Sequence, residues 1–91
     1  MPDPETYIVY ILRSINNPGK TYVGMTNDIC HRLSEHNAGT QVYSHRYAPW
    51  KLITHVVCTD RTVACKFERY LKTPSGKAFL TKHLVQPVLH P

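Results

Sequence analysis

The sequence has 91 residues, 42% of them hydrophobic, which is enough for one domain with a modest core and too apolar for a disordered chain. Eleven Lys and Arg against six Asp and Glu give a formal net charge of +5, which suits a nucleic acid partner but also occurs in many mildly basic proteins. No apolar run approaches the length of a membrane span, and residues 1–5 do not have the pattern of a signal peptide.

The first two predicted elements form a β-hairpin. Residues 7–12 are a run of apolar, β-favouring residues, and because both faces are apolar we expect an inner strand covered on both sides. The Asn-Asn-Pro-Gly sequence at 16–19 is typical of a turn, and residues 21–25 follow as a second, antiparallel strand. Gly24 near the end of that strand indicates a bulge or the close approach of another group.

A helix is predicted over residues 28–37. On its helical wheel Ile29 and Leu33 form the buried stripe. Arg32 and His36 are an i,i+4 pair beside that stripe, so we expect them at the boundary between core and solvent. A side chain in such a place is positioned by the core and can still reach a substrate.

The rest of the chain predicts one more strand and two more helices. The run 50–58 contains a third strand centred on residues 52–57, and helices are expected over 61–72 and from 74 to about 84. These elements predict an α+β fold, with helices packed on a small three-stranded antiparallel sheet. We expect a single domain whose core covers residues 6–84.

The second of these helices carries an acid at the edge of its apolar face. The residues of that face are Val63, Ala64, Phe67 and Leu71. Glu68 borders the face and is the only acid after Asp60. Acids are rarely placed there unless they are paired or bind a metal. The pattern therefore leaves a salt bridge, to Arg61, Lys72 or another cation, or a metal site as alternatives.

Several side chains have the chemistry that phosphodiester hydrolysis needs. A tyrosine such as Tyr10 or Tyr22 can accept a proton from water if a cation lowers its pKa. The guanidinium of Arg32 can bind two phosphate oxygens, and His36 can contact a phosphate or relay a proton. Each also has a simpler interpretation, as a half-buried strand tyrosine, a solvated helix cation, or a histidine interacting with a helix C-terminus.

The order of these residues resembles that of a known family. Ile8-Val9-Tyr10, then Tyr22-Val23-Gly24, Arg32 and Glu68 follow one another as in GIY-YIG nuclease domains, over residues 7–84. Small stand-alone members and the N-terminal nuclease domain of the bacterial excinuclease are the most similar, although Ile8 replaces the first glycine. The resemblance implies a metal-dependent endonuclease that hydrolyses phosphodiester bonds in DNA, in repair or recombination.

The resemblance also implies roles for individual residues. It makes Tyr22 the general base, Tyr10 its neighbour in the phosphate site, and Arg32 the stabiliser of transition-state charge. His36 occupies a position where related domains often have tyrosine or histidine, from which it could contact the scissile phosphate or share the proton relay. Glu68 holds a single Mg²⁺ (or Mn²⁺) together with water and phosphate oxygens. These five catalytic residues are expected to line one concave surface.

Two further observations limit these interpretations. A nucleic-acid-binding module with the same fold and weak or no catalysis is the alternative, because the first tripeptide departs from the family pattern. Cys30, Cys58 and Cys65 lack CxxC spacing, and no Cys or His pair has zinc-finger spacing, so a zinc site is disfavoured. We expect reduced thiols in a cytoplasmic protein.

Overall fold

The computed structural model describes residues 6–39 and 45–85. In this part of the chain three strands form one antiparallel sheet with the order β2-β1-β3, where β1 is Tyr7–Ser14, β2 is Thr21–Thr26 and β3 is Trp50–Cys58. The central place of β1 confirms the inner strand predicted from its apolar faces, and β1 and β2 are the predicted antiparallel neighbours.

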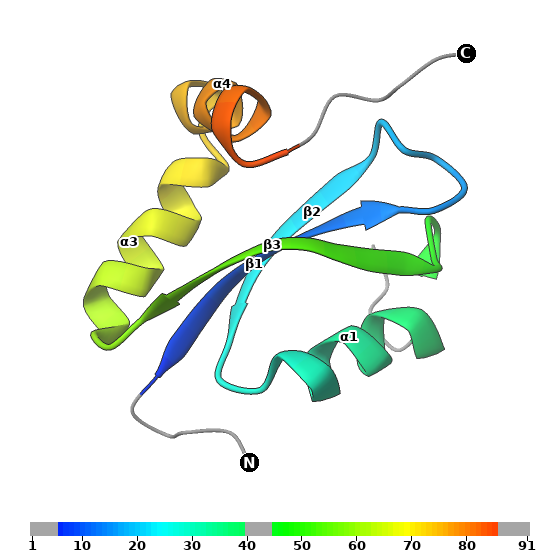
Figure 1. Cartoon of the computed structure of the whole chain (residues 1–91), viewed down its shortest axis with the longest axis horizontal. Coiled ribbons are helices and arrows are strands. Elements are labelled where there is room, and N and C mark those ends of the chain that lie inside the picture. The colour runs from blue at the N-terminus through cyan, green and yellow to red at the C-terminus, as the bar shows by residue number, and fades with distance from the viewer. Residues whose placement is uncertain (1–5, 40–44, 86–91) are drawn as a thin grey trace.

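Helices cover both faces of this sheet. Helix α1 (Ile29–Ala38) lies on one side, and α3 (Arg61–Leu71) and α4 (Pro74–His83) lie on the other (Figure 1). The α+β fold predicted from the sequence is therefore confirmed. Within residues 6–39 and 45–85, the helices are too short or too polar to cross a membrane.

Alternating side chains of β1 divide the interior into two cores. Val9 and Ile11 point to one face and pack against an aliphatic group from α3 and α4: Ala64, Leu71 and Leu80. Tyr10 and Leu12 point to the other face, where Trp50 and half-buried residues of α1 complete a largely aromatic core. The two faces of the same strand thus have different chemistry.

Capping residues fix where the helices begin and end. The carboxylates of Asp28 and Asp60 accept hydrogen bonds from backbone N–H groups in the first turns of α1 and α3. The Thr73 hydroxyl accepts a hydrogen bond from the backbone N–H of Gly76 in the first turn of α4, and Pro74 follows Thr73. Helix α1 ends at Gly39, whose φ of 79° is left-handed and favours glycine. These short-range signals explain why the predicted helix bounds agree closely with the structure.

Two details differ from the sequence prediction. Strand β1 extends two residues beyond position 12, because Arg13 and Ser14 pair with β3. Val63 was expected on the apolar face of α3, but it lies at the edge of the stripe formed by Ala64 and Leu71 and is 55% exposed.

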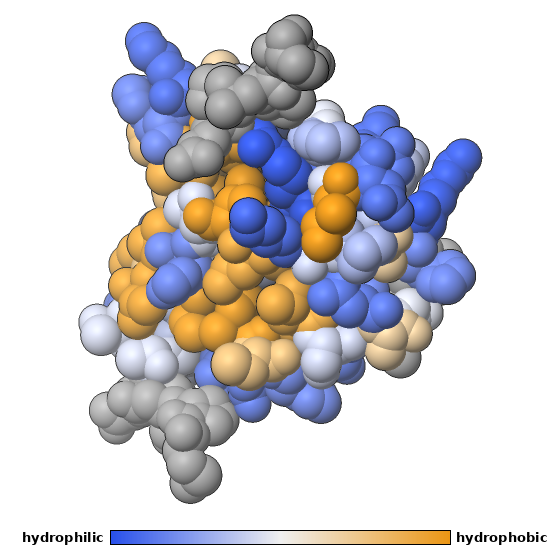
Figure 2. All heavy atoms as spheres, turned by 45° about the vertical axis from the view of Figure 1, so that its right-hand side comes forward, coloured by the Kyte–Doolittle hydropathy of each residue, from blue (hydrophilic) through white to orange (hydrophobic). Residues whose placement is uncertain are grey.

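On the side of the molecule drawn in Figure 2, hydrophobic residues gather in one area bordered by hydrophilic ones.

Candidate active site

Gly24 creates the space in which Tyr10 lies. The two residues are directly opposite each other on β2 and β1. A Cβ atom at position 24 would overlap the hydroxyl and ring of Tyr10, so any larger residue would displace that side chain. Gly24 therefore lets the Tyr10 ring lie across β2, which confirms the close approach predicted for this glycine.

His36 is fully buried in contact with two tyrosines. Its Nε2 atom lies 3.0 Å from the Tyr10 hydroxyl oxygen in a hydrogen bond, and its ring centroid lies 4.7 Å from that of Tyr22. The expectation that His36 lies at the solvent boundary is therefore wrong. The reason is that His36 follows Ile29 by seven residues and Leu33 by three, which places it on the buried stripe of α1.

Burial sets the protonation of the Tyr10 and His36 pair. It raises the pKa of Tyr10, and the nearby charges of Tyr22, Glu68 and Glu35 raise it further against the opposing effect of Arg32. Burial also lowers the pKa of His36, and the Arg32 charge acts in the same direction. Both groups are therefore neutral near pH 7, and Tyr10 keeps its proton and does not act as a base.

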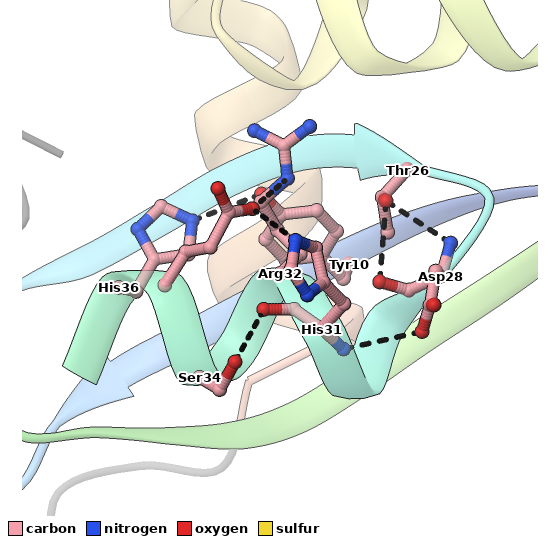
Figure 3. A network of polar contacts seen from close by, with 8 residues as sticks. Tyr10, Thr26, Asp28, His31, Arg32, Ser34 and His36 are labelled. Carbon is pink, nitrogen blue, oxygen red and sulfur yellow. Dashed lines mark hydrogen bonds and ion pairs between the residues drawn. The ribbon is translucent and has the colours of Figure 1, made fainter. Parts of the chain in front are cut away.

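Arg32 is half-buried and pairs with an acid that the sequence interpretation did not select. Its Nε atom lies 3.6 Å from Oε1 of Glu35, and the same oxygen lies 3.7 Å from Nε2 of His31 (Figure 3). The i,i+3 and i,i+4 spacing of these residues was the available sequence signal. Partly exposed pairs of this kind contribute only about 0–1 kcal/mol, so Arg32 can exchange Glu35 for a phosphate.

Hydrogen bonds at both ends of α1 hold these side chains in place. At the N-terminal end, the Thr26 hydroxyl contacts the backbone of Asp28. At the C-terminal end, the Asn37 amide donates to the Trp50 carbonyl at 3.2 Å and accepts from the Trp50 N–H at 2.5 Å. Helix α1 is thus joined to β3, and the site residues on it keep a fixed position over the sheet.

Glu68 lies on α3, which covers the opposite face of the sheet from α1. Its Oε2 atom lies 2.6 Å from Nζ of Lys72, so the salt bridge considered as an alternative is present. Its charge also raises the pKa of Tyr10, after the larger effects of burial and of Tyr22. Arg32 acts on the same hydroxyl from the α1 side. The two charged residues, on helices that cover different faces of the sheet, therefore have opposite effects on the pKa of Tyr10.

Tyr10, Tyr22 and His36 contact one another, but the five predicted residues do not all line an open surface. Tyr10 is 1% exposed and His36 is 0% exposed, so both lie behind the surface rather than on it. Tyr22, Arg32 and Glu68 are partly exposed and remain accessible. The expectation of five residues lining one concave surface is thus wrong for Tyr10 and His36, because these two form a buried hydrogen-bonded pair that packs against the ring of Tyr22.

The donor set suits a metal that takes few protein ligands. Among the described residues, no group of three or more His, Cys, Asp or Glu side chains could hold a metal ion. The side chain of Glu68 is 21% exposed and offers one carboxylate. Mg²⁺ commonly keeps several waters and binds one or two carboxylates plus substrate phosphates, so a single accessible carboxylate fits such a site once Lys72 moves away.

Comparison with known proteins places this geometry in context. The model of the GIY-YIG catalytic domain matches residues 6–82. A structure-specific endonuclease subunit SLX1 of Talaromyces marneffei is 38% identical over 73 residues, which are 74% of this chain and 19% of that protein. A UPF0213 protein of Desulfotalea psychrophila is 32% identical over 84 residues, which are 88% of this chain and 74% of that protein.

A solved structure has the same fold. The solution NMR structure of a UPF0213 protein from Bacillus halodurans is 25% identical, has a TM-score of 0.55, and covers 90% of this chain and 88% of its own. In contrast, this chain spans only 18% to 29% of the length of the similar SLX1 proteins. The similarity to SLX1 therefore concerns one part of those proteins.

Proposed function

Because this chain belongs to the GIY-YIG catalytic domain family, we propose that it is a metal-dependent endonuclease that hydrolyses phosphodiester bonds in DNA. The observation that carries the proposal is the contact of Tyr10, Tyr22 and His36 with one another, with Arg32 on the same helix as His36. The names of the SLX1 relatives and the net charge of +5 support DNA as the substrate and repair or recombination as the setting.

In this proposal each tyrosine has a distinct task. Tyr22 is partly exposed, so its hydroxyl proton can leave to solvent, and the resulting phenolate oxygen then accepts the proton of the attacking water. Tyr10 keeps its own proton, because burial raises its pKa. Its hydrogen bond holds His36 in place, and the His36 ring packs against the ring of Tyr22. A general base requires access to water, and of the two tyrosines Tyr22 has that access.

The charged residues act on the phosphate. Arg32 leaves Glu35 and donates two hydrogen bonds to phosphate oxygens, which stabilises the charge that grows in the transition state. Enzymes of this family use a divalent metal ion, and here Glu68 would hold Mg²⁺ or Mn²⁺, which neutralises phosphate charge and stabilises the leaving oxygen. Lys72, released from Glu68, stays close to the DNA backbone.

One observation favours a second candidate. The 2.6 Å contact between Lys72 and Glu68 occupies the carboxylate that a metal would need. If this salt bridge persists with DNA bound, the chain is a nucleic-acid-binding module with weak or no catalysis. The degenerate first tripeptide, with Ile8 in place of glycine, supports the same alternative.

A cleavage assay separates these candidates. Single-stranded, nicked, flapped and branched DNA would each be incubated with the protein and Mg²⁺ or Mn²⁺, with EDTA as the control. We expect cleavage of at least one substrate that EDTA abolishes. Binding without cleavage under every condition would favour the binding module. Neither binding nor cleavage at low salt would contradict both candidates, because a basic DNA-binding surface is strongest there.

A further inference from the structure

A cavity lies between the edge strand β2 and the junction of α3 with α4. Its volume is about 460 Å³, within the range of about 300–1,000 Å³ that is typical of small-ligand pockets. It is bordered by the turn before β2, by β2 itself, by the end of α3 and by one side of α4. The cavity therefore joins segments that are far apart in the sequence, and the candidate active site uses only its rim.

The lining of this cavity combines positive charge with apolar surface. Lys20, Lys72 and Lys77 come from three separate segments and surround it, and Val23 and Leu80 contribute apolar area. None of the described residues that line it is acidic. Three cations at the border of an apolar hollow suit a ligand that has both an anionic group and a flat hydrophobic part, as a nucleotide has.

Two lining residues also belong to the candidate active site. Tyr22 borders the cavity on the edge strand, while its ring packs on the α1 face of the sheet against His36. Lys72 borders it too, and its ammonium group contacts Glu68 at 2.6 Å. A ligand in the cavity is therefore next to the contact of Lys72 with the proposed metal ligand, and the edge strand β2 separates it from the ring of the proposed general base. A DNA strand with its scissile phosphate at Tyr22 would put a neighbouring nucleotide at the cavity.

We propose that this cavity binds one unpaired nucleotide of the DNA substrate, next to the bond that is cleaved. The inference rests on the proposed function, because it takes the DNA strand to lie across Tyr22 and Glu68. The lysines contact the phosphates, and the apolar side chains contact the sugar and base. A base inside a duplex is held by stacking and pairing and must leave both to enter a pocket. The cavity thus favours DNA with a flap, gap or branch.

The test compares binding to two DNAs with equal numbers of phosphates, a complete duplex and a duplex with a single-stranded flap, in EDTA so that no cleavage occurs. Wild type should bind the flapped DNA more tightly. Thr81 lines the cavity from an exposed position on α4, and Thr81→Trp fills the cavity without changing the charge. This variant should lower the ratio of flap to duplex affinity by about tenfold, the typical scale of one stacked base.

Lysine variants provide an independent readout. Lys20 and Lys77 are exposed, so Lys20→Ala combined with Lys77→Ala should fold even where Thr81→Trp does not. The double variant should weaken flap binding more than duplex binding and flatten the log–log salt dependence by about 0.7 per lost contact. The matched control is Lys82→Ala, which removes an exposed lysine of α4 outside the cavity lining and should affect both DNAs equally.

The outcomes separate this inference from the proposed function. Equal affinity of wild type for the two DNAs, or an unchanged ratio in folded variants of both kinds, overturns the cavity as a nucleotide site. If the ratio falls as expected but wild type never cleaves, the nucleotide site stands and the endonuclease proposal fails. If wild type cleaves but the ratio is unchanged in the variants, the endonuclease proposal stands and this inference fails.

Discussion

The two faces of β1 differ in the kind of group that they bury. Toward α3 and α4, the strand buries Val9 and Ile11 among aliphatic side chains. Toward α1, it buries Tyr10, whose hydroxyl forms a hydrogen bond with a histidine that is also fully buried. An aliphatic core contributes stability through area removed from water, whereas a buried polar pair contributes little net stability and is costly to break. The first face stabilises the fold, and the second keeps the Tyr10 and His36 side chains of the candidate site in a fixed position.

The largest expected effect is on the aromatic face and concerns activity. Tyr22→Phe removes the hydroxyl that is proposed to accept the water proton, so the single-turnover cleavage rate should fall by about 10²–10⁴-fold. The ring remains, so unfolding free energy and DNA affinity should change little. Tyr70→Phe, which removes the hydroxyl of an exposed tyrosine on α3, is the matched control and should cleave normally. A wild-type rate for Tyr22→Phe would remove Tyr22 from the mechanism.

On the aliphatic face the expected effect concerns stability instead. Ile11 is 1% exposed, so Ile11→Ala leaves a cavity and should lower the free energy of unfolding by about 2–5 kcal/mol. The cleavage rate per folded molecule, measured well below the melting temperature, should remain near that of wild type. Denaturant unfolding and cleavage would be measured on the same sample. A large loss of rate in the folded variant would show that the two faces are not separate in function.

A smaller effect, on both stability and cleavage, is expected from a change at Tyr10. Tyr10→Phe keeps the ring but removes the hydroxyl that contacts Nε2 of His36, leaving that buried atom without this hydrogen bond. The free energy of unfolding should fall by about 1–3 kcal/mol. Cleavage should also fall, because His36 loses its hydrogen bond and no longer holds the ring of Tyr22 in place. Denaturant unfolding tests the first expectation, and unchanged stability would mean that the pair contributes nothing to the fold.

The sequence predicted the elements well because their signals are local. Turn residues, caps and apolar periodicity lie within a few positions of the segments that they define, as with Asp28 and Asp60. The last two residues of β1 were missed because they depend on pairing with β3. The contacts between Asn37 and Trp50 were missed for the same reason, since the two residues are distant in sequence and meet only in the fold.

The candidate site was predictable in its members and less so in its environment. The resemblance to the family selected the five residues, and the structure shows Tyr10, Tyr22 and His36 in contact, whereas the roles of all five stay predictions. The burial of His36 was misjudged because polar residues are usually exposed, although its spacing from Ile29 indicated the buried stripe. For Glu68, the sequence left both a salt bridge and a metal site open. The contact with Lys72 shows the salt bridge, and the metal site stays a prediction.

The smallest expected effect is a dependence of stability on pH. The pKa of His36 is lowered in the folded protein, so below its ordinary value of 6.5 the unfolded chain binds a proton that the folded protein does not. This contribution to stability is present above pH 6.5 and is lost as the pH falls toward the folded-state pKa. Urea unfolding at several pH values between about 7 and 5 would measure it. His36→Gln should lose this part of the pH dependence, and an identical pH profile in that variant would contradict the assignment.

The measurement that tests the account most directly is cleavage by Glu68→Gln in Mg²⁺. The amide keeps the shape of the side chain and removes the charge that a metal requires. We predict that cleavage falls by orders of magnitude, because a metal contributes several kcal/mol to the transition state and each ~1.4 kcal/mol is tenfold. DNA binding should persist or tighten, and the melting temperature should stay near that of wild type. Cleavage at the wild-type rate, or a lower melting temperature as the main effect, would show that Glu68 serves only its salt bridge with Lys72.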